Sequence, residues 1–110
     1  MITQEMAEKA VDWLRDHADE MAKARATRLY IEQWMKSHKA ALQMQTGESS
    51  VARAEVEALA DARYHETLLA YKAAVENDEF MRWTAAAAEA KIEFWRSQEA
   101  TRRIEGKATT

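Results

Sequence analysis

Histidines and carboxylates are the side chains with which this 110-residue sequence could bind a metal. Helical bundles that hold two metal ions use Glu-x-x-His pairs projecting inward from facing helices. The residues at that spacing before the three histidines are Leu14, Met35 and Ala62. The reversed pair His17 and Glu20 and the pair Glu89 and Glu93 are the remaining combinations. A carboxylate metal-binding bundle is therefore the least favoured alternative, and the sequence predicts no metal ligands.

Nucleophilic catalysis has no complete set of groups in this sequence. The chain contains no cysteine, which excludes a thiolate nucleophile and a disulfide scaffold. Ser37 and His38 are neighbours, but adjacent residues on a helix point in different directions. We therefore expect a protein that is not an enzyme, with no catalytic residue and no cofactor.

Charged residues interrupt an apolar line in the first half of the chain. Arg25, Arg28 and Glu32 continue the line that Val11 and Leu14 begin. We predict a polar layer that fixes the register of packed helices, completed by acidic residues of the second half. The predicted layer is Arg25, Arg28, Glu32, Glu89 and Glu93, and the other acidic candidates are Glu76, Asp78 and Glu79. An anion or phosphate site and simple exposure to solvent are the alternatives.

Basic and aromatic residues gather towards the carboxyl terminus. From Phe80 onwards six basic residues stand against four acidic ones, whereas the formal net charge of the whole chain is -3. That balance excludes a clamp that grips DNA over its whole surface. The candidate contacts to a partner, or weakly to single-stranded nucleic acid, are Arg96, Arg102, Arg103 and Lys107. Tryptophans at helical spacing are more often core residues.

Long helices must carry all of these groups, because the chain has no proline and its two glycines are Gly47 and Gly106. We predict helices over 3–45, 51–59 and 62–104, forming one domain over 1–105, with a frayed tail at 106–110. Thr3, Ser49 or Ser50, and Asp61 are the expected caps. Breaks near 16–20 and 77–79 are the alternative to unbroken helices. The fold class is all-α, an elongated antiparallel helical hairpin with a short linking helix.

Apolar residues recur at coiled-coil spacing in both long segments. Two antiparallel helices cover only a narrow seam, so we expect the hairpin to complete its core by dimerising into a helical bundle. The aromatic and aliphatic residues expected to build this homodimer are Trp13, Ile31, Trp34, Phe80, Trp83 and Phe94.

The amino terminus and the hydropathy of the chain bear on its location. The first residues, MITQEMAEKAVDW, show neither a basic nor an apolar region of a signal peptide. The longest nearly apolar run, 83–88, is far shorter than the roughly 20 residues that cross a bilayer. We predict a soluble cytoplasmic protein with no membrane partner.

Two segments resemble a group of small, mostly uncharacterised proteins of temperate phages and prophages. They are AVDWLRDHADEMAKARATRLYIEQWMKSHKAALQ and FMRWTAAAAEAKIEFWRSQEATRR, and the second contains the recurring block at 87–96. The resemblance implies a bacterial host cell and genes near phage recombination and replication functions. It implies a non-enzymatic accessory protein that acts by protein–protein interaction with a phage or host recombination or replication protein. A weak single-stranded nucleic-acid binder is the alternative function.

Overall fold

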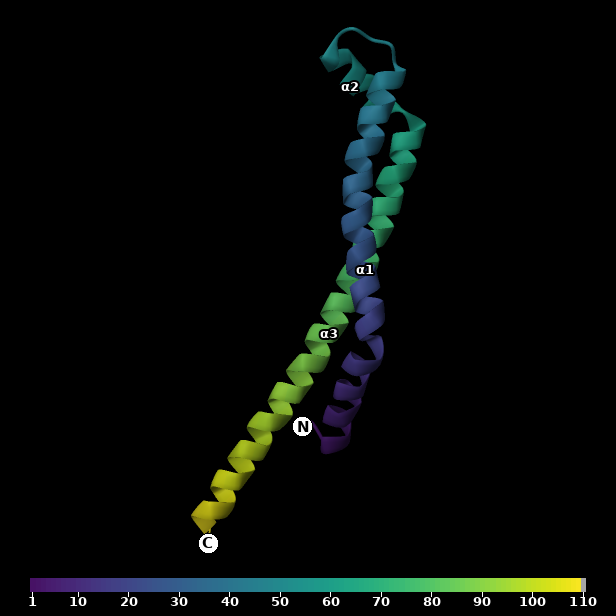
Figure 1. Cartoon of the computed structure of the whole chain (residues 1–110). Helices are drawn as coiled ribbons and strands as arrows, with labels where there is room; N and C mark the ends of the chain where they lie inside the picture. The colour runs from purple at the N-terminus through teal and green to yellow at the C-terminus, as the bar shows by residue number, and fades with distance from the viewer. Residues whose placement is uncertain (110) are drawn as a thin grey trace. The chain divides into compact units, whose positions relative to one another are not determined.

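The structure is a computed structural model that describes residues 1–109, with side chains to residue 108. It contains three helices, α1 (Gln4–Gln45), α2 (Val51–Ala60) and α3 (Ala62–Thr109), and no strand within these residues (Figure 1). The predicted all-α class and the order of long, short and long helix are confirmed. The predicted end of the last helix near residue 104 is not confirmed, because α3 continues through Gly106 to Thr109. Thr110 lies outside the described residues.

Both ends of α1 are set by short polar side chains. Thr3 is the amino-terminal cap, since its Oγ1 accepts a hydrogen bond from the Met6 amide at 3.2 Å. After the last helical residue, the Thr46 hydroxyl donates to the Gln43 carbonyl at 2.8 Å. Gly47 follows with φ of 68°. The helix therefore ends where the sequence turns to a residue that adopts left-handed backbone freely.

The two glycines should respond in opposite directions to replacement by alanine. Gly47→Ala places a Cβ in the left-handed region, so we expect a loss of about 1 kcal/mol in the free energy of unfolding. Gly106→Ala removes a helical glycine that has open space around it, so we expect a gain of up to about 1 kcal/mol and more helix. Urea unfolding followed by circular dichroism measures both. Equal effects of the two substitutions would contradict the conformations assigned to them.

A single residue, Asp61, separates α2 from α3. Its amide donates to the Ala58 carbonyl at 3.2 Å and closes α2. Its Oδ1 accepts from the Arg63 amide at 2.8 Å and opens α3, while its Oδ2 accepts from Arg63 Nη2 at 2.8 Å. Ser50 caps the start of α2. The two predicted caps at these junctions are confirmed.

Acid should weaken the junction at Asp61. The side-chain hydrogen bonds from Arg63, followed by the Arg63 amide, lower the pKa of Asp61 from 3.8 to about 2. Because the folded-state pKa is depressed, the stabilisation is fully present above about pH 4 and is lost as the pH falls towards 2. We expect Asp61→Asn to lower the melting temperature at pH 7 and to flatten its dependence on pH between 4 and 2. An unchanged pH dependence in this variant would contradict this assignment.

The contacts divide the described chain into two compact units, and α1 and α3 each continue from one to the other. The first unit contains Met1–Met21 and α3 from Phe80 onwards, and the second contains Ala22–Glu79. The boundaries lie directly after 16–20 and 77–79, the positions considered for helix breaks. Both helices are unbroken there. The residues predicted to form a single domain, 1–105, are thus divided between two compact units.

The first unit is packed around small residues. In α1 the buried residues are Ala7 and Ala10, and in α3 they are Met81 and Ala88. At its end the Ile2 amide donates to Gln98 Oε1 at 3.1 Å, and Gln98 Nε2 donates to the Ile2 carbonyl at 2.7 Å. The start of the chain therefore lies beside the late part of α3, as antiparallel helices require.

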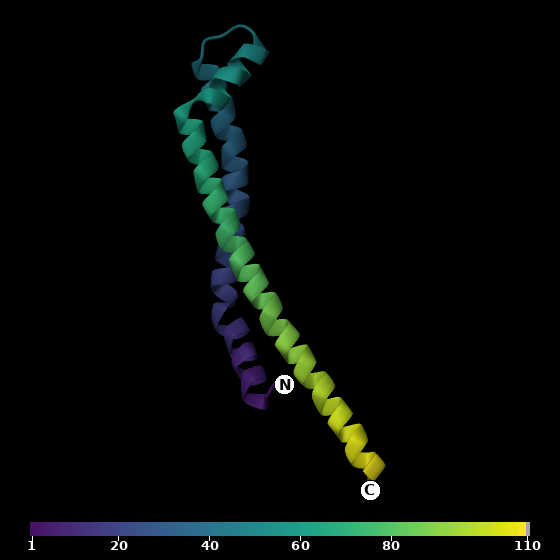
Figure 2. The same cartoon turned by 180° about the vertical axis from the view of Figure 1, so that it is seen from behind.

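The second unit has its core where all three helices meet. Leu42 of α1, Ala58 of α2 and Tyr64 of α3 form a buried cluster against which Met35 packs. Lys39 Nζ donates to Glu55 Oε1 at 2.7 Å and adds a polar tie between α1 and α2. Figures 1 and 2 both show the last half of α1 beside the first half of α3, with α2 at the end of the pair. This unit is an antiparallel hairpin closed by the short helix.

Candidate functional site

Arg28 is the centre of the polar layer in the second unit. Its Nη1 donates to Asp78 Oδ2 at 2.9 Å and to Glu79 Oε1 at 3.4 Å. The Arg28 and Asp78 side chains are only 30% and 13% exposed. The hydrogen bond to Asp78 raises the pKa of Arg28 above its usual value. Arg28 Nε is buried without a hydrogen-bond partner among the described residues, so this pair carries a cost in desolvation.

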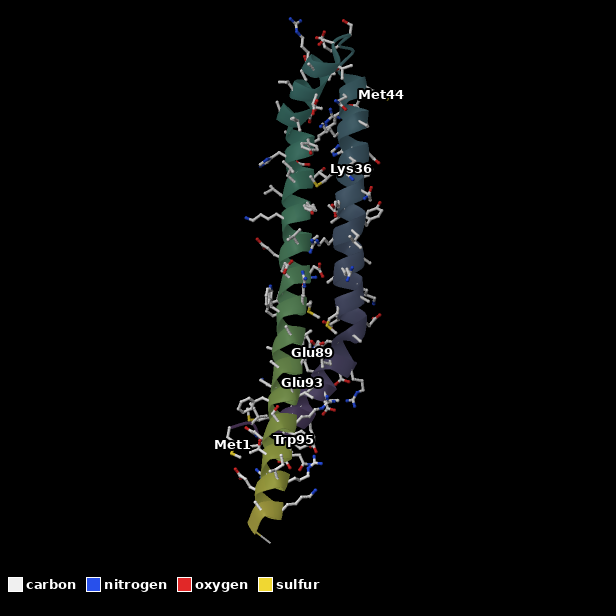
Figure 3. All side chains as sticks on the ribbon, turned by 90° about the vertical axis from the view of Figure 1, so that its left-hand side faces the viewer. Met1, Lys36, Met44, Glu89, Glu93 and Trp95 are labelled. Carbon is white, nitrogen blue, oxygen red and sulfur yellow. The ribbon has the colours of Figure 1, made fainter. Side chains whose placement is uncertain are left out.

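Glu89 and Glu93 of the predicted layer are not the partners of Arg28. Arg25 is exposed and Glu32 is half-buried, both in the second unit, whereas Glu89 and Glu93 are exposed on α3 in the first unit (Figure 3). Glu93 Oε1 accepts instead from Arg96 at 2.9 Å on its own helix. The assignment of Glu89 and Glu93 to the layer is therefore corrected.

The connection between α1 and α3, which runs through residues 46–61 and includes α2, limits which residues of the two long helices face each other. The pairs of Arg28 with Asp78 and His38 with Thr67 show the resulting register. Glu89 lies eleven residues beyond Asp78 on α3, which is about 16 Å along a helix. No arginine side chain at position 28 spans that distance. Of the acidic candidates considered, Asp78 and Glu79 have the matching positions.

The predicted basic contacts lie on the last turns of α3. Arg96 pairs with Glu93 at 2.9 Å and Arg102 pairs with Glu99 at 3.1 Å, each within the helix. Arg103 and Lys107 are exposed. The four residues thus share one segment, in which neighbouring carboxylates partly neutralise Arg96 and Arg102. A solvated helix end with moderate positive charge results.

Two histidines have structural partners that the sequence analysis missed. His17 stacks on Trp13 with ring centroids 4.4 Å apart, and His38 stacks on Trp34 at 5.3 Å. His17 Nδ1 lies 2.9 Å from the Trp13 carbonyl. The repeated spacing W-x-x-x-H, with its two copies 21 residues apart, is the signal that reveals them, because residues four apart share a helix face.

The hydrogen bonds around His38 define its tautomer. His38 Nδ1 lies 2.7 Å from Thr67 Oγ1, and the same hydroxyl bonds to the Arg63 carbonyl at 3.2 Å. The hydroxyl donates its one proton to the carbonyl, so His38 Nδ1 carries a proton and donates to Thr67. Both histidines are thus held by hydrogen bonds and ring stacking. The described residues contain no group of three or more metal-ligating side chains.

An apolar line on α3 is largely exposed among the described residues of the first unit. Phe80, Trp83 and Phe94 are 67%, 69% and 55% exposed. Ala87 and Ala90 lie between the aromatic residues and are exposed as well. These five residues, here called the outer seam, follow one another at intervals of three and four residues. Such a line is the signature of a helix that packs against another helix.

The outer seam faces away from the packed side of α3. At 100° per residue, its centre lies roughly 140° around the helix from the buried residues Met81 and Ala88. The prediction that Phe80, Trp83 and Phe94 build a bundle therefore does not apply to the packing within this chain. Trp34 is also exposed, at 47%, whereas Trp13 and Ile31 are half-buried. The three aromatic residues of the outer seam thus remain largely exposed among the described residues.

Comparisons with known proteins do not assign this surface. No known protein family matches the chain, no curated protein is similar to it, and no solved structure resembles it. Among the described residues no helix combines the length and the apolar character needed to span a bilayer. The candidate site is therefore defined by the outer seam and the basic segment that follows it.

Proposed function

We propose that this chain is a non-enzymatic protein that acts by helix-mediated protein–protein interaction through the outer seam. The observation that carries the proposal is the exposure of three large aromatic side chains in one uncharged line. Contiguous apolar patches on a protein surface mark interaction sites, and a helix face offers them at regular spacing. A role as an accessory protein of a phage recombination or replication module in the bacterial cytoplasm is supported by the resemblance of the two segments.

The basic segment of α3 supplies the polar flank of this proposed surface. Arg96, Arg102, Arg103 and Lys107 begin two residues after Phe94, the last residue of the seam. Aromatic and arginine side chains are the residues enriched at protein interfaces. The same segment motivates the alternative function, weak binding of single-stranded nucleic acid.

The mass of the native protein tests the proposed function. A tagged form is recovered from bacterial cells that carry the phage module, and its native mass is compared with the 12.6 kDa of one chain. We expect a larger complex that Trp83→Glu disrupts, because a charge in the seam opposes its burial. Tyr30→Glu, at an equally exposed aromatic residue of the second unit, is the matched control. A single chain at 12.6 kDa in all three preparations would refute the proposed function.

Nucleic-acid binding is separated from this proposal by an anisotropy titration. A labelled single strand is titrated with the purified protein at low and at moderate salt. We expect no saturable binding, because the formal net charge of the chain is -3 and carboxylates of the same helix partly neutralise Arg96 and Arg102. Salt-sensitive saturation that disappears when Arg96, Arg102 and Arg103 are changed to alanine would establish the alternative function instead.

A further inference from the structure

Starting from the proposed function, on which this inference rests, we infer that the outer seam binds the outer seam of a second copy of this chain, with the two helices antiparallel. The spacing and the sizes of the seam residues, and the absence of charge among them, suit such a pairing. Its order is large, large, small, small, large: Phe80, Trp83, Ala87, Ala90 and Phe94. All five residues belong to α3 of the first unit.

The sizes of the seam residues match under a two-fold axis. An axis placed midway between Ala87 and Ala90 brings Ala87 of one copy opposite Ala90 of the other. The same operation sets Trp83 opposite Phe94 and Phe80 opposite Ser97. Each such contact occurs twice, which is the arrangement of an isologous dimer interface. Alanine at the centre permits helix axes to approach to about 8 Å, and the aromatic rings close the layers on both sides.

The positions beside the seam contain no like charges that face each other in this arrangement. Glu93 of one copy lies beside Ala86 of the other, and Lys91 lies beside Thr84. The seam itself is uncharged. Helices associate in this way where the facing positions are uncharged or carry opposite charges.

A parallel arrangement is electrostatically worse. It places the basic segments of both copies, residues 96–107, side by side, and each has four basic and two acidic residues. It also aligns the two helix dipoles in the same direction. The antiparallel arrangement separates the two basic segments and opposes the dipoles. It also leaves both basic segments at opposite ends of the paired helices, where each can contact a partner.

The exposed aromatic side chains of the seam supply a large part of the area that a dimer requires. An aromatic side chain can bury about 150–250 Å², and Phe80, Trp83 and Phe94 are 55–69% exposed. The three aromatic residues of two copies therefore supply roughly 600–950 Å². Specific interfaces bury about 1,200–2,000 Å² in total. The alanines and the neighbouring side chains along the seam contribute the remainder.

Sedimentation equilibrium of the purified chain, with no other protein present, tests whether a second copy of the chain binds the outer seam. We expect twice the 12.6 kDa of one chain. Ala90→Glu should raise the dissociation constant at least about 30-fold, because it introduces a charge at the centre of the interface. Ala26→Glu makes the same change at an exposed alanine of α1 in the second unit and should leave the mass unchanged. Circular dichroism verifies that both variants remain helical.

Introduced cysteines test the orientation, since the chain has none of its own. In the antiparallel pair the two copies of residue 97 lie about 25 Å apart along the axis, too far for a disulfide. We expect Ser97→Cys to stay reduced while an oxidised mixture of Ala87→Cys and Ala90→Cys chains cross-links. A rapid Ser97→Cys disulfide would overturn the antiparallel arrangement.

Failure of this inference is distinguishable from failure of the proposed function. A chain that is monomeric when purified alone, but that forms a seam-dependent complex with another protein in cells, overturns the second copy as occupant and retains the proposed function. A dimer whose mass Ala90→Glu does not change overturns the seam as the contact surface. A monomer in both settings overturns both.

Discussion

Leu42→Ala is expected to lower the free energy of unfolding by about 2–5 kcal/mol. Leu42 is 2% exposed and packs in the cluster with Ala58 and Tyr64, where all three helices of the second unit meet. Truncation removes its apolar contacts and leaves a cavity. Because α2 has only ten residues, it depends on this cluster for its position. We therefore expect faster hydrogen exchange throughout α2 as well as a lower urea midpoint.

Met44→Ala is the matched control for this experiment. It lies two residues further along α1 and is 85% exposed (Figure 3). A surface substitution of this kind changes stability by no more than about 0.5 kcal/mol. If Leu42→Ala is as mild as Met44→Ala, the cluster is not the core of the second unit.

Met81→Ala is expected to have the corresponding effect in the first unit, a loss of about 2–5 kcal/mol. The other buried hydrophobic residues described there are the alanines Ala7, Ala10 and Ala88. Met81 is therefore the largest buried side chain of that unit among the described residues. Its small neighbours cannot move to fill the space that the substitution leaves. We therefore expect the cavity to remain and to add to the loss of stability.

The location of the Met81→Ala effect tests the division into two units. Hydrogen exchange should accelerate in Met1–Met21 and in α3 after Phe80, and less in the second unit, because cooperative units open separately. Ile104→Ala, at a residue of the same helix that is 69% exposed, is the control. Uniform acceleration over the whole chain would show one cooperative unit in place of two.

The boundaries of the helices follow from local chemistry, which is why the sequence predicts most of them. Thr3, Ser50 and Asp61 each accept a hydrogen bond from an amide that has no partner within its helix. Gly47 supplies the left-handed residue after α1. The prediction that α3 ends before Gly106 is wrong, because a single glycine destabilises a helix by only about 1 kcal/mol and does not by itself stop it.

The partner of Arg28 in the polar layer could not be predicted from the sequence. The position of Arg28 in an apolar line indicates that it needs an acidic partner, and periodicity alone left several acidic residues of α3 available. In the structure Asp78 and Glu79 are the partners, because the whole connection over 46–61 and the packing around it set which turns of α1 and α3 are adjacent. The relative position of two helices is a non-local quantity that no residue pattern within one helix contains.

The helical class, the three helices and their caps can be predicted from the sequence, because they depend on backbone propensity and on hydrogen bonds between residues four or fewer positions apart. Which of two apolar lines on α3 is covered depends on the packing of α1 against α3. Met81 and Ala88 are buried while Phe80, Trp83 and Phe94 are exposed. Both lines have helical periodicity, and α1 can cover only one face of α3, so packing buried one line and left the outer seam exposed.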